Sequence, residues 1–170
     1  MDLQAVLKQL DEGDRALRAS VAGVTDDIAR REPAPGSWSV LQCLEHLVLA
    51  EDYMFGLIVS ASPVDEPVVN ERRELAISER GTDRTRRLEA PKLVHPQGAI
   101  VSIDAGLAGW AVTRARTRAF VERCTEDLRC RLTMHPILGQ ATAYEILLVI
   151  AVHPSRHAQQ IAAARAAAGS

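Results

Sequence analysis

Apolar residues recur at three- and four-residue steps in four long segments of this 170-residue chain, residues 2–30, 39–60, 102–128 and 142–168. This spacing collects apolar side chains on one face of an α-helix. In the first segment the recurring apolar positions are Leu3, Val6, Leu7, Leu10, Leu17, Val21, Val24 and Ile28. The pattern therefore predicts four long helices.

Two of these helices begin with a recognisable N-terminal signal. Ser39 is followed three residues later by Gln42, and Thr142 is followed in the same way by Glu145. In such a capping box the side chain of the first residue accepts a hydrogen bond from the backbone amide of the residue three positions later, whose own side chain bonds back to the first residue's amide. The first helix is expected to stop before the Pro/Gly-rich residues 31–37, "REPAPGS".

The connection between the second and third predicted helices is long, from Ala61 to Val101, and it is dense in charges of both signs. A structureless connection of this length is uncommon in a compact domain, so we expect a short helix at Glu71–Ser78. Four long helices are the components of a four-helix bundle. The prediction is an all-α protein with one domain over residues 1–170.

Composition agrees with this fold and narrows the function. Hydrophobic residues make up 47% of the chain and aromatic residues only 4%, a mixture that favours helices. Basic and acidic side chains number 20 and 22, so we expect no nucleic-acid partner and no binding to an anionic membrane. The longest apolar run, residues 146–152, is too short to span a bilayer, and the N-terminus is unlike a signal peptide. We expect a cytoplasmic protein.

His153 and His157 lie four residues apart in the fourth predicted helix. Side chains with this spacing are only about 40° apart around the helix, so both imidazoles can reach one ion. Since the apolar run before them indicates a buried helix, His46 in the apolar second helix is the natural third ligand. Three imidazoles suit zinc and other divalent first-row metals. A lone buried histidine is also often a core residue without a ligand role.

The remaining candidates have plainer readings. His95 and His135 each precede a proline, which predicts loop positions; surface turns are expected, although His135 could cap a turn or line the site mouth. Cys43, one turn before His46, is expected to be a buried structural thiol, with a soft fourth ligand or redox thiol as the alternative. The three cysteines, Cys43, Cys124 and Cys130, predict no disulfide framework or zinc knuckle. Pro154 predicts a kink or π-like bulge between the paired histidines.

The charged and aromatic candidates are Glu45, Glu51, Trp38 and a group of arginines in the crossover. Glu45 and Glu51 are expected to be solvated or salt-bridged on the surface, and no general base is identified, so the catalytic residues are unknown. Trp38 is expected to plug the bundle end near the start of the second helix. An arginine cluster in the crossover could meet an anionic cosubstrate, but a solvated loop is the simpler reading; its members are Arg80, Arg84, Arg86 and Arg87.

Three motifs, in order, resemble the DinB-like superfamily, particularly its YfiT-like branch of metal-dependent hydrolases. They are "WSVLQCLEHL" (residues 38–47), "HPILG" (135–139) and "HPSRHAQQI" (153–161). The resemblance implies an up-down-down-up four-helix bundle with a long crossover between the second and third helices. It implies a divalent metal (zinc, nickel, iron or manganese) on His46, His153 and His157, and Gln160 matches the family's glutamine. Characterised relatives include transferases and isomerases that use low-molecular-weight thiols such as bacillithiol or mycothiol.

Two functions remain open at this point. The first is a metal-dependent enzyme, a thiol S-transferase or a hydrolase, acting on a small-molecule substrate. The second is a non-catalytic bundle in which the metal is structural or absent and the protein binds a ligand or dimerises. A homodimer is plausible for either, because a bundle rich in Ala and Leu offers flat apolar helix faces.

Overall fold

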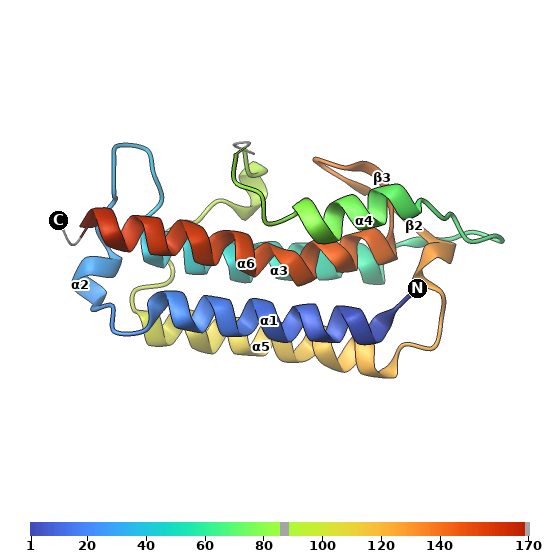
Figure 1. Ribbon diagram of the computed structural model, residues 1–170, viewed down its shortest axis with the longest axis horizontal. Helices are drawn as coiled ribbons and strands as arrows, with labels where there is room; N and C mark the ends of the chain where they lie inside the picture. Colours follow the sequence, from blue (N-terminus) through green and yellow to red (C-terminus); the bar gives the residue numbers. More distant parts are fainter. Residues whose placement is uncertain (86–88, 169–170) are drawn as a thin grey trace.

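The computed structural model describes residues 1–85 and 89–168, in which four long helices lie side by side as a bundle (Figure 1). These helices are α1 (Leu3–Val21), α3 (Val40–Val59), α5 (Ile103–Arg123) and α6 (Ala143–Ala168). Figure 1 shows α1 and α6 running in one direction and α3 and α5 in the other. The up-down-down-up bundle with its long crossover between α3 and α5 is therefore confirmed.

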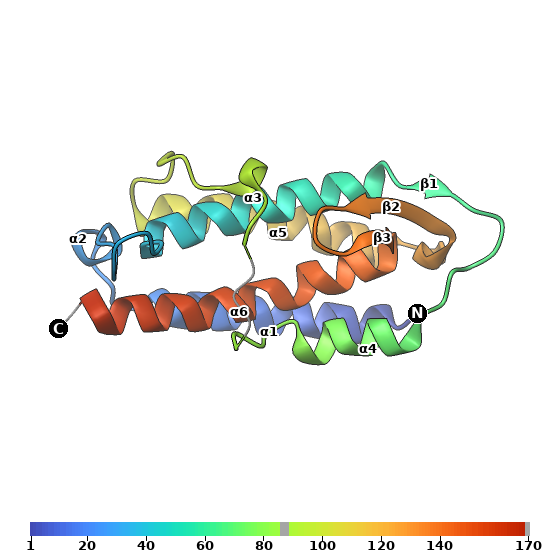
Figure 2. The same ribbon diagram turned by 90° about the horizontal axis from the view of Figure 1, so that it is seen from above.

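Shorter elements decorate the bundle. The helices are α2 (Asp26–Ala29) and α4 (Glu71–Arg80), and the 3-10 turns are η1 (Lys92–Val94) and η2 (Leu128–Cys130). Strands β1 (Ser62–Pro63), β2 (Arg131–His135) and β3 (Gly139–Thr142) form an antiparallel sheet in the order β1-β2-β3, with Leu132 opposite both Ser62 and Thr142. The sheet lies where α6 begins (Figure 2). The sequence pattern did not predict it.

The predicted helix starts are confirmed. Ser39 and Gln42 form both hydrogen bonds of a capping box at the start of α3. At the start of α6 the Thr142 amide donates to Glu145 Oε2 (2.9 Å) and the Glu145 amide donates to Thr142 Oγ1 (3.1 Å). The short crossover helix is also present as α4, two residues longer than expected.

Two predicted helix ends were wrong. The segment 2–30 is not one helix, because the chain turns after Val21 through Gly23, whose φ of +73° suits glycine, and restarts as α2 behind the Thr25 cap. The segment 102–128 ends as α5 at Arg123, since Cys124 is extended (φ −70°, ψ 118°). The apolar periodicity continues past both helix ends, so the sequence pattern did not predict them.

Pro154 lies inside α6, which is α-helical from Ala143 to Ala168, so the π-like bulge was wrong. The axis of α6 bends along its length (Figure 2). Pro154 faces α1 at Gly13: a Cβ atom added to Gly13 would lie 3.2 Å from Pro154 Cγ and 3.1 Å from the Ala151 carbonyl oxygen. The absence of a side chain at Gly13 therefore lets α1 approach α6 at the proline.

Two groups of buried apolar side chains fill the bundle. One surrounds the first half of α6 and the other lies toward its C-terminal half, where Leu17, Leu44, Trp110 and Ile161 are buried. A charged pair also lies inside: Glu51 and Arg114, 2% and 4% exposed, form an ion pair at 2.8 Å. Glu51 is therefore salt-bridged, as one of the two expectations held. The expected surface location of Glu51 was wrong, because α5 covers that face of α3.

Among residues 1–85 and 89–168, no helix combines the length and the apolar character needed to cross a membrane.

Candidate metal centre

The structure brings together the three histidines that the sequence singled out. His46 comes from α3, and His153 and His157 come from successive turns of α6. One ring nitrogen of each lies within 4.8 Å of the others. The ring centroids are 4.5 Å apart for His153 and His157, 4.7 Å for His46 and His157, and 5.2 Å for His46 and His153. Pro154 has therefore not moved His153 out of the cluster.

The spacing of two of the three ring nitrogens fits a transition metal. The Nε2 atoms of His153 and His157 are 3.0 Å apart. A metal at about 2.0–2.1 Å from each imidazole nitrogen requires nitrogens roughly 3.0–3.4 Å apart, for bond angles from octahedral to tetrahedral. Without an ion, one of these two nitrogens must carry a proton, whereas a shared cation accepts both lone pairs. The cluster could hold a metal ion, and the donor set does not specify which metal.

His46 is held in one tautomer by the crossover. Its Nδ1 atom lies 2.8 Å from the Val94 carbonyl oxygen. Because a carbonyl only accepts hydrogen bonds, Nδ1 carries the proton and Nε2 keeps a lone pair for the cluster. A second hydrogen bond of this kind commonly orients histidines that bind metals. Val94 was missed from the sequence, since a backbone oxygen leaves no signal in the residue type.

His157 has an unusual polar environment. Its Nδ1 atom is buried and makes no hydrogen bond within the described part of the chain. The side chain of Gln160, one turn further along α6, nevertheless interacts with His157 closely enough to raise its pKa. Gln160 therefore lies near the His157 ring.

Their surroundings favour the neutral form of all three rings. Burial is the largest cause in each case: it lowers the pKa of His46, lowers that of His157 to about 3, and lowers that of His153 well below its ordinary value. His153 still keeps some accessible surface, although protein atoms surround its ring densely. A neutral imidazole is the form that binds a metal, so the cluster needs no proton release to accept one.

Trp38, just before the start of α3, also lies beside the histidines, a contact that the sequence did not predict. Its ring centroid is 4.7 Å from that of His46 and 6.5 Å from that of His157, the latter nearly parallel at 20°. His95 packs edge-on against the other side of Trp38 at 5.8 Å. Trp38 thus packs its ring against two of the three clustered histidines and against His95 of the crossover.

His95 and His135 do not join the cluster. His95 follows η1 and is half-buried, with Nε2 2.8 Å from the Ala90 carbonyl oxygen. His135 ends β2, and its Nδ1 atom accepts hydrogen bonds from the amides of Ile137 and Leu138, both at 3.2 Å. His135 therefore caps a turn, as one reading held, but at 8% exposed it is buried and the surface location was wrong.

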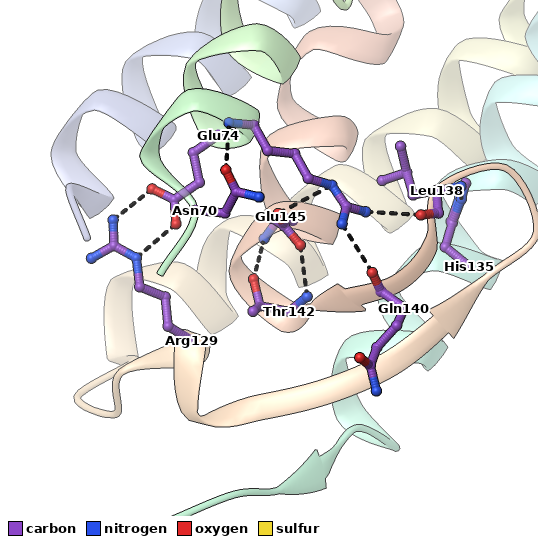
Figure 3. A network of polar contacts seen from close by, with 9 residues as sticks. Asn70, Glu74, Arg129, His135, Leu138, Gln140, Thr142 and Glu145 are labelled. Atoms are coloured by element: carbon purple, nitrogen blue, oxygen red, sulfur yellow. Dashed lines mark hydrogen bonds and ion pairs between the residues drawn. The ribbon is translucent and has the colours of Figure 1, made fainter. Parts of the chain in front are cut away.

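A network of charged side chains fastens the crossover to the sheet and to the start of α6 (Figure 3). Arg73 of α4 donates to the carbonyl oxygens of Leu138 (2.9 Å) and Gln140 (3.0 Å) and pairs with Glu145 (3.2 Å). Glu74 pairs with Arg129, at 2.8 and 2.6 Å. These contacts fix α4 on the bundle, upstream of the segment that approaches the histidines.

Glu45 anchors the other end of the crossover, so its expected exposure was also wrong. It is 4% exposed, and its carboxylate accepts hydrogen bonds from the amides of Gln97 (2.7 Å) and Gly98 (3.0 Å). Because Val94 bonds His46 only a few residues upstream, the carboxylate positions the segment that orients that ring. The partners lie more than fifty residues away in the sequence, which explains why a local reading missed them.

Cys43 is buried, as expected, and is not among the potential ligands that the described residues bring together. Burial raises the pKa of its thiol to about 12, so it stays protonated. Arg86 and Arg87 of the expected arginine cluster, and the side chain of Arg80, lie outside the described residues. Arg84 is described and exposed.

Comparison with known proteins places this arrangement in a family. A family model, described as the DinB superfamily, matches residues 9–161 of the chain. No curated protein matches the sequence. The match covers α3 and α5 in full, most of α1 and α6, and all three clustered histidines.

Proposed function

The chain belongs to the DinB superfamily, and we propose that it is a metal-dependent enzyme acting on a small molecule. In this proposal His46, His153 and His157 hold a divalent transition metal. The observation that supports it most directly is the convergence of three neutral imidazoles, one ring nitrogen of each within 4.8 Å of the others.

A divalent metal bound by three neutral imidazoles keeps its full charge and lowers the pKa of a thiol or water that binds to it, which yields a nucleophile at neutral pH. The chain itself supplies the orientation. Val94 fixes the His46 tautomer, and the Trp38 ring packs against that of His46. No carboxylate belongs to the cluster, so we assign no general base.

The thiol route is the preferred branch of the proposal, because an ion without anionic ligands attracts a thiolate strongly. The thiol would give up its proton, and its sulfur would bond to an electrophilic carbon as the leaving group departs from that carbon, chloride in the case of 1-chloro-2,4-dinitrobenzene. Hydrolysis by an activated water is the other branch. Both branches require the metal and differ only in whether a thiol is consumed.

The test combines metal content with a thiol-dependence assay. The purified chain, reconstituted with zinc, nickel, iron or manganese in turn, is given 1-chloro-2,4-dinitrobenzene as an electrophilic probe, with and without a low-molecular-weight thiol. We expect consumption that requires both metal and thiol and that His157→Ala abolishes. His135→Ala is the matched control, since this buried histidine lies outside the cluster.

Two results would count against the proposal. Consumption that is equal with and without thiol would exclude the transferase branch. A metal content below about 0.1 equivalent after reconstitution would exclude both branches and favour a non-catalytic bundle that binds a ligand or dimerises.

A further inference from the structure

The hairpin between β2 and β3 turns beside a buried histidine. Residues 136–138 connect the strands, and His135 lies opposite Gly139, whose φ of +69° suits glycine. The Nδ1 atom of His135 accepts hydrogen bonds from the amides of Ile137 and Leu138, both at 3.2 Å. Asn and Ser side chains commonly hold turns in this way, through an oxygen that does not titrate near neutral pH. In this turn the acceptor belongs to a titratable ring.

Both hydrogen bonds require that the His135 ring be neutral. Because the two amides donate, Nδ1 keeps its lone pair and the ring proton lies on Nε2. In the imidazolium form both ring nitrogens are donors, so turning the ring over does not restore an acceptor. Protonation of His135 therefore removes both hydrogen bonds and leaves the amides of Ile137 and Leu138 facing a donor.

The same turn is joined to the crossover by Arg73 of α4. The Arg73 guanidinium donates to the carbonyl oxygens of Leu138 (2.9 Å) and Gln140 (3.0 Å), the residues on either side of Gly139 (Figure 3). Leu138 thus has its amide bonded to His135 and its carbonyl bonded to Arg73. Burial is the largest cause that lowers the pKa of His135, and the positive charge of Arg73 lowers it further. A protonated His135 would therefore repel the cation that holds Leu138.

The other charged groups on the surrounding elements have partners of their own. β2 packs against β1, β3, α3 and α6, and neither β1 nor β3 carries a charged side chain. Within the described residues, Arg73 is the charged group that acts on the pKa of His135. Charged contacts of β2, α3, α4 and α6 include Glu145 with Arg73, Glu74 with Arg129, Arg131 with Glu126, Glu51 with Arg114, Asp52 with Arg116, and Glu45 with the amides of Gln97 and Gly98.

We propose that His135 is a pH switch in the joint between the hairpin and the crossover, closed when its ring is neutral and opened when its ring is protonated. In the closed state the turn at residues 136–138 presents the Leu138 carbonyl to Arg73. In the open state the turn loses both amide contacts, and the tip of the hairpin separates from α4. The switch does not depend on the proposed function, because His135 is outside the three-histidine cluster.

The direction of the pH dependence follows from the lowered pKa of His135. The closed turn binds the proton less readily than the open turn, whose imidazole has the ordinary pKa of 6.5. The closed turn is therefore fully stable above pH 6.5 and loses stability as the pH falls from 6.5 toward the lowered pKa. Over this window the equilibrium constant for opening should rise by up to about tenfold per pH unit.

The test is amide hydrogen exchange of the full chain, followed by NMR between pH 7 and pH 5 and corrected for the intrinsic exchange rate at each pH. In the unmodified chain the protection of the Ile137 and Leu138 amides should fall as the pH is lowered. In His135→Asn it should stay constant, because the Asn side-chain oxygen accepts both amides without titrating. The cluster histidines are unchanged in this variant, so their own titration contributes equally to both chains.

His95→Asn is the matched control, since His95 also precedes a proline but bonds the Ala90 carbonyl and accepts no amide within the described residues. This variant should keep the pH dependence of the unmodified chain. Constant protection of Ile137 and Leu138 from pH 7 to pH 5 in the unmodified chain would overturn the switch, as would a His135→Asn variant with the same pH dependence. If His135→Asn does not fold, the unmodified chain alone decides, through the presence or absence of the pH-dependent loss of protection.

Discussion

Replacing Glu45 by glutamine tests how the crossover is held against the histidine cluster. The two carboxylate oxygens accept hydrogen bonds from the amides of Gln97 at 2.7 Å and Gly98 at 3.0 Å, while the Ile100 amide at 3.5 Å adds little. Glutamine keeps one carbonyl oxygen and turns an NH₂ group toward the other amide. The variant thus loses one charge-assisted hydrogen bond and leaves one partly buried amide donor without its partner.

The magnitude follows from these contacts. A hydrogen bond to a charged group contributes about 1.5–3 kcal/mol, so Glu45→Gln should lower the free energy of unfolding by roughly 2–3 kcal/mol. For a chain of this size the melting temperature should fall by about 4–12 °C. Because the displaced segment includes the Val94 carbonyl that orients His46, metal affinity should fall by about 10-fold.

Urea unfolding gives the free energy, and competition with a chelator gives the metal affinity. Glu12→Gln is the control, since Glu12 is on the exposed face of α1 with only a long contact to Lys8 (3.9 Å) and should change stability by less than about 0.5 kcal/mol. A loss below about 1 kcal/mol in Glu45→Gln, with unchanged metal affinity, would refute the anchoring role of this carboxylate.

Three further predictions concern the packing and charges of the bundle. Gly13→Ala should be about 1–2 kcal/mol less stable than the control variant Gly56→Ala in thermal unfolding. The reason is that an added Cβ atom meets Pro154 and Ala151 at position 13 but only open space at position 56. Equal stabilities of the two variants would contradict the close approach of α1 and α6. Arg114→Met should lower the free energy of unfolding by about 3–5 kcal/mol, because it leaves the buried Glu51 without its ion-pair partner. In urea unfolding, the double variant Arg114→Met/Glu51→Met should recover most of this loss. Additive losses from the two substitutions would contradict the pairing. Burial raises the pKa of Glu51, so the folded state binds this proton more readily than the unfolded state. The stability of the unmodified chain relative to Glu51→Gln should therefore fall as pH rises from the unfolded pKa of 4.5 through the raised folded value, and a rise over that window would contradict the shift.

Local signals carried much of the fold. The capping boxes at Ser39 and Thr142 involve residues only three apart, so the sequence alone located the starts of α3 and α6. The spacing of His153 and His157 on one helix was equally local. His46 joined them because a four-helix bundle brings the apolar faces of its helices together, and the structure shows that convergence.

Features that depend on distant partners escaped prediction. The strands β1 and β3 are too short to show an alternating pattern, and β1 pairs with β2 from a distant part of the chain. Glu45 looked like a surface residue because nothing nearby in sequence indicates the crossover amides that bury it. Trp38 likewise acquires its place only when the crossover brings His95 against it.

The central claim is that His46, His153 and His157 hold one metal ion. Crystals grown with Zn²⁺ and measured on both sides of the zinc absorption edge test it directly. We predict one anomalous peak per chain at about 2.0–2.1 Å from one ring nitrogen of each of the three histidines. An empty cluster, or zinc bound only elsewhere on the chain, would contradict it.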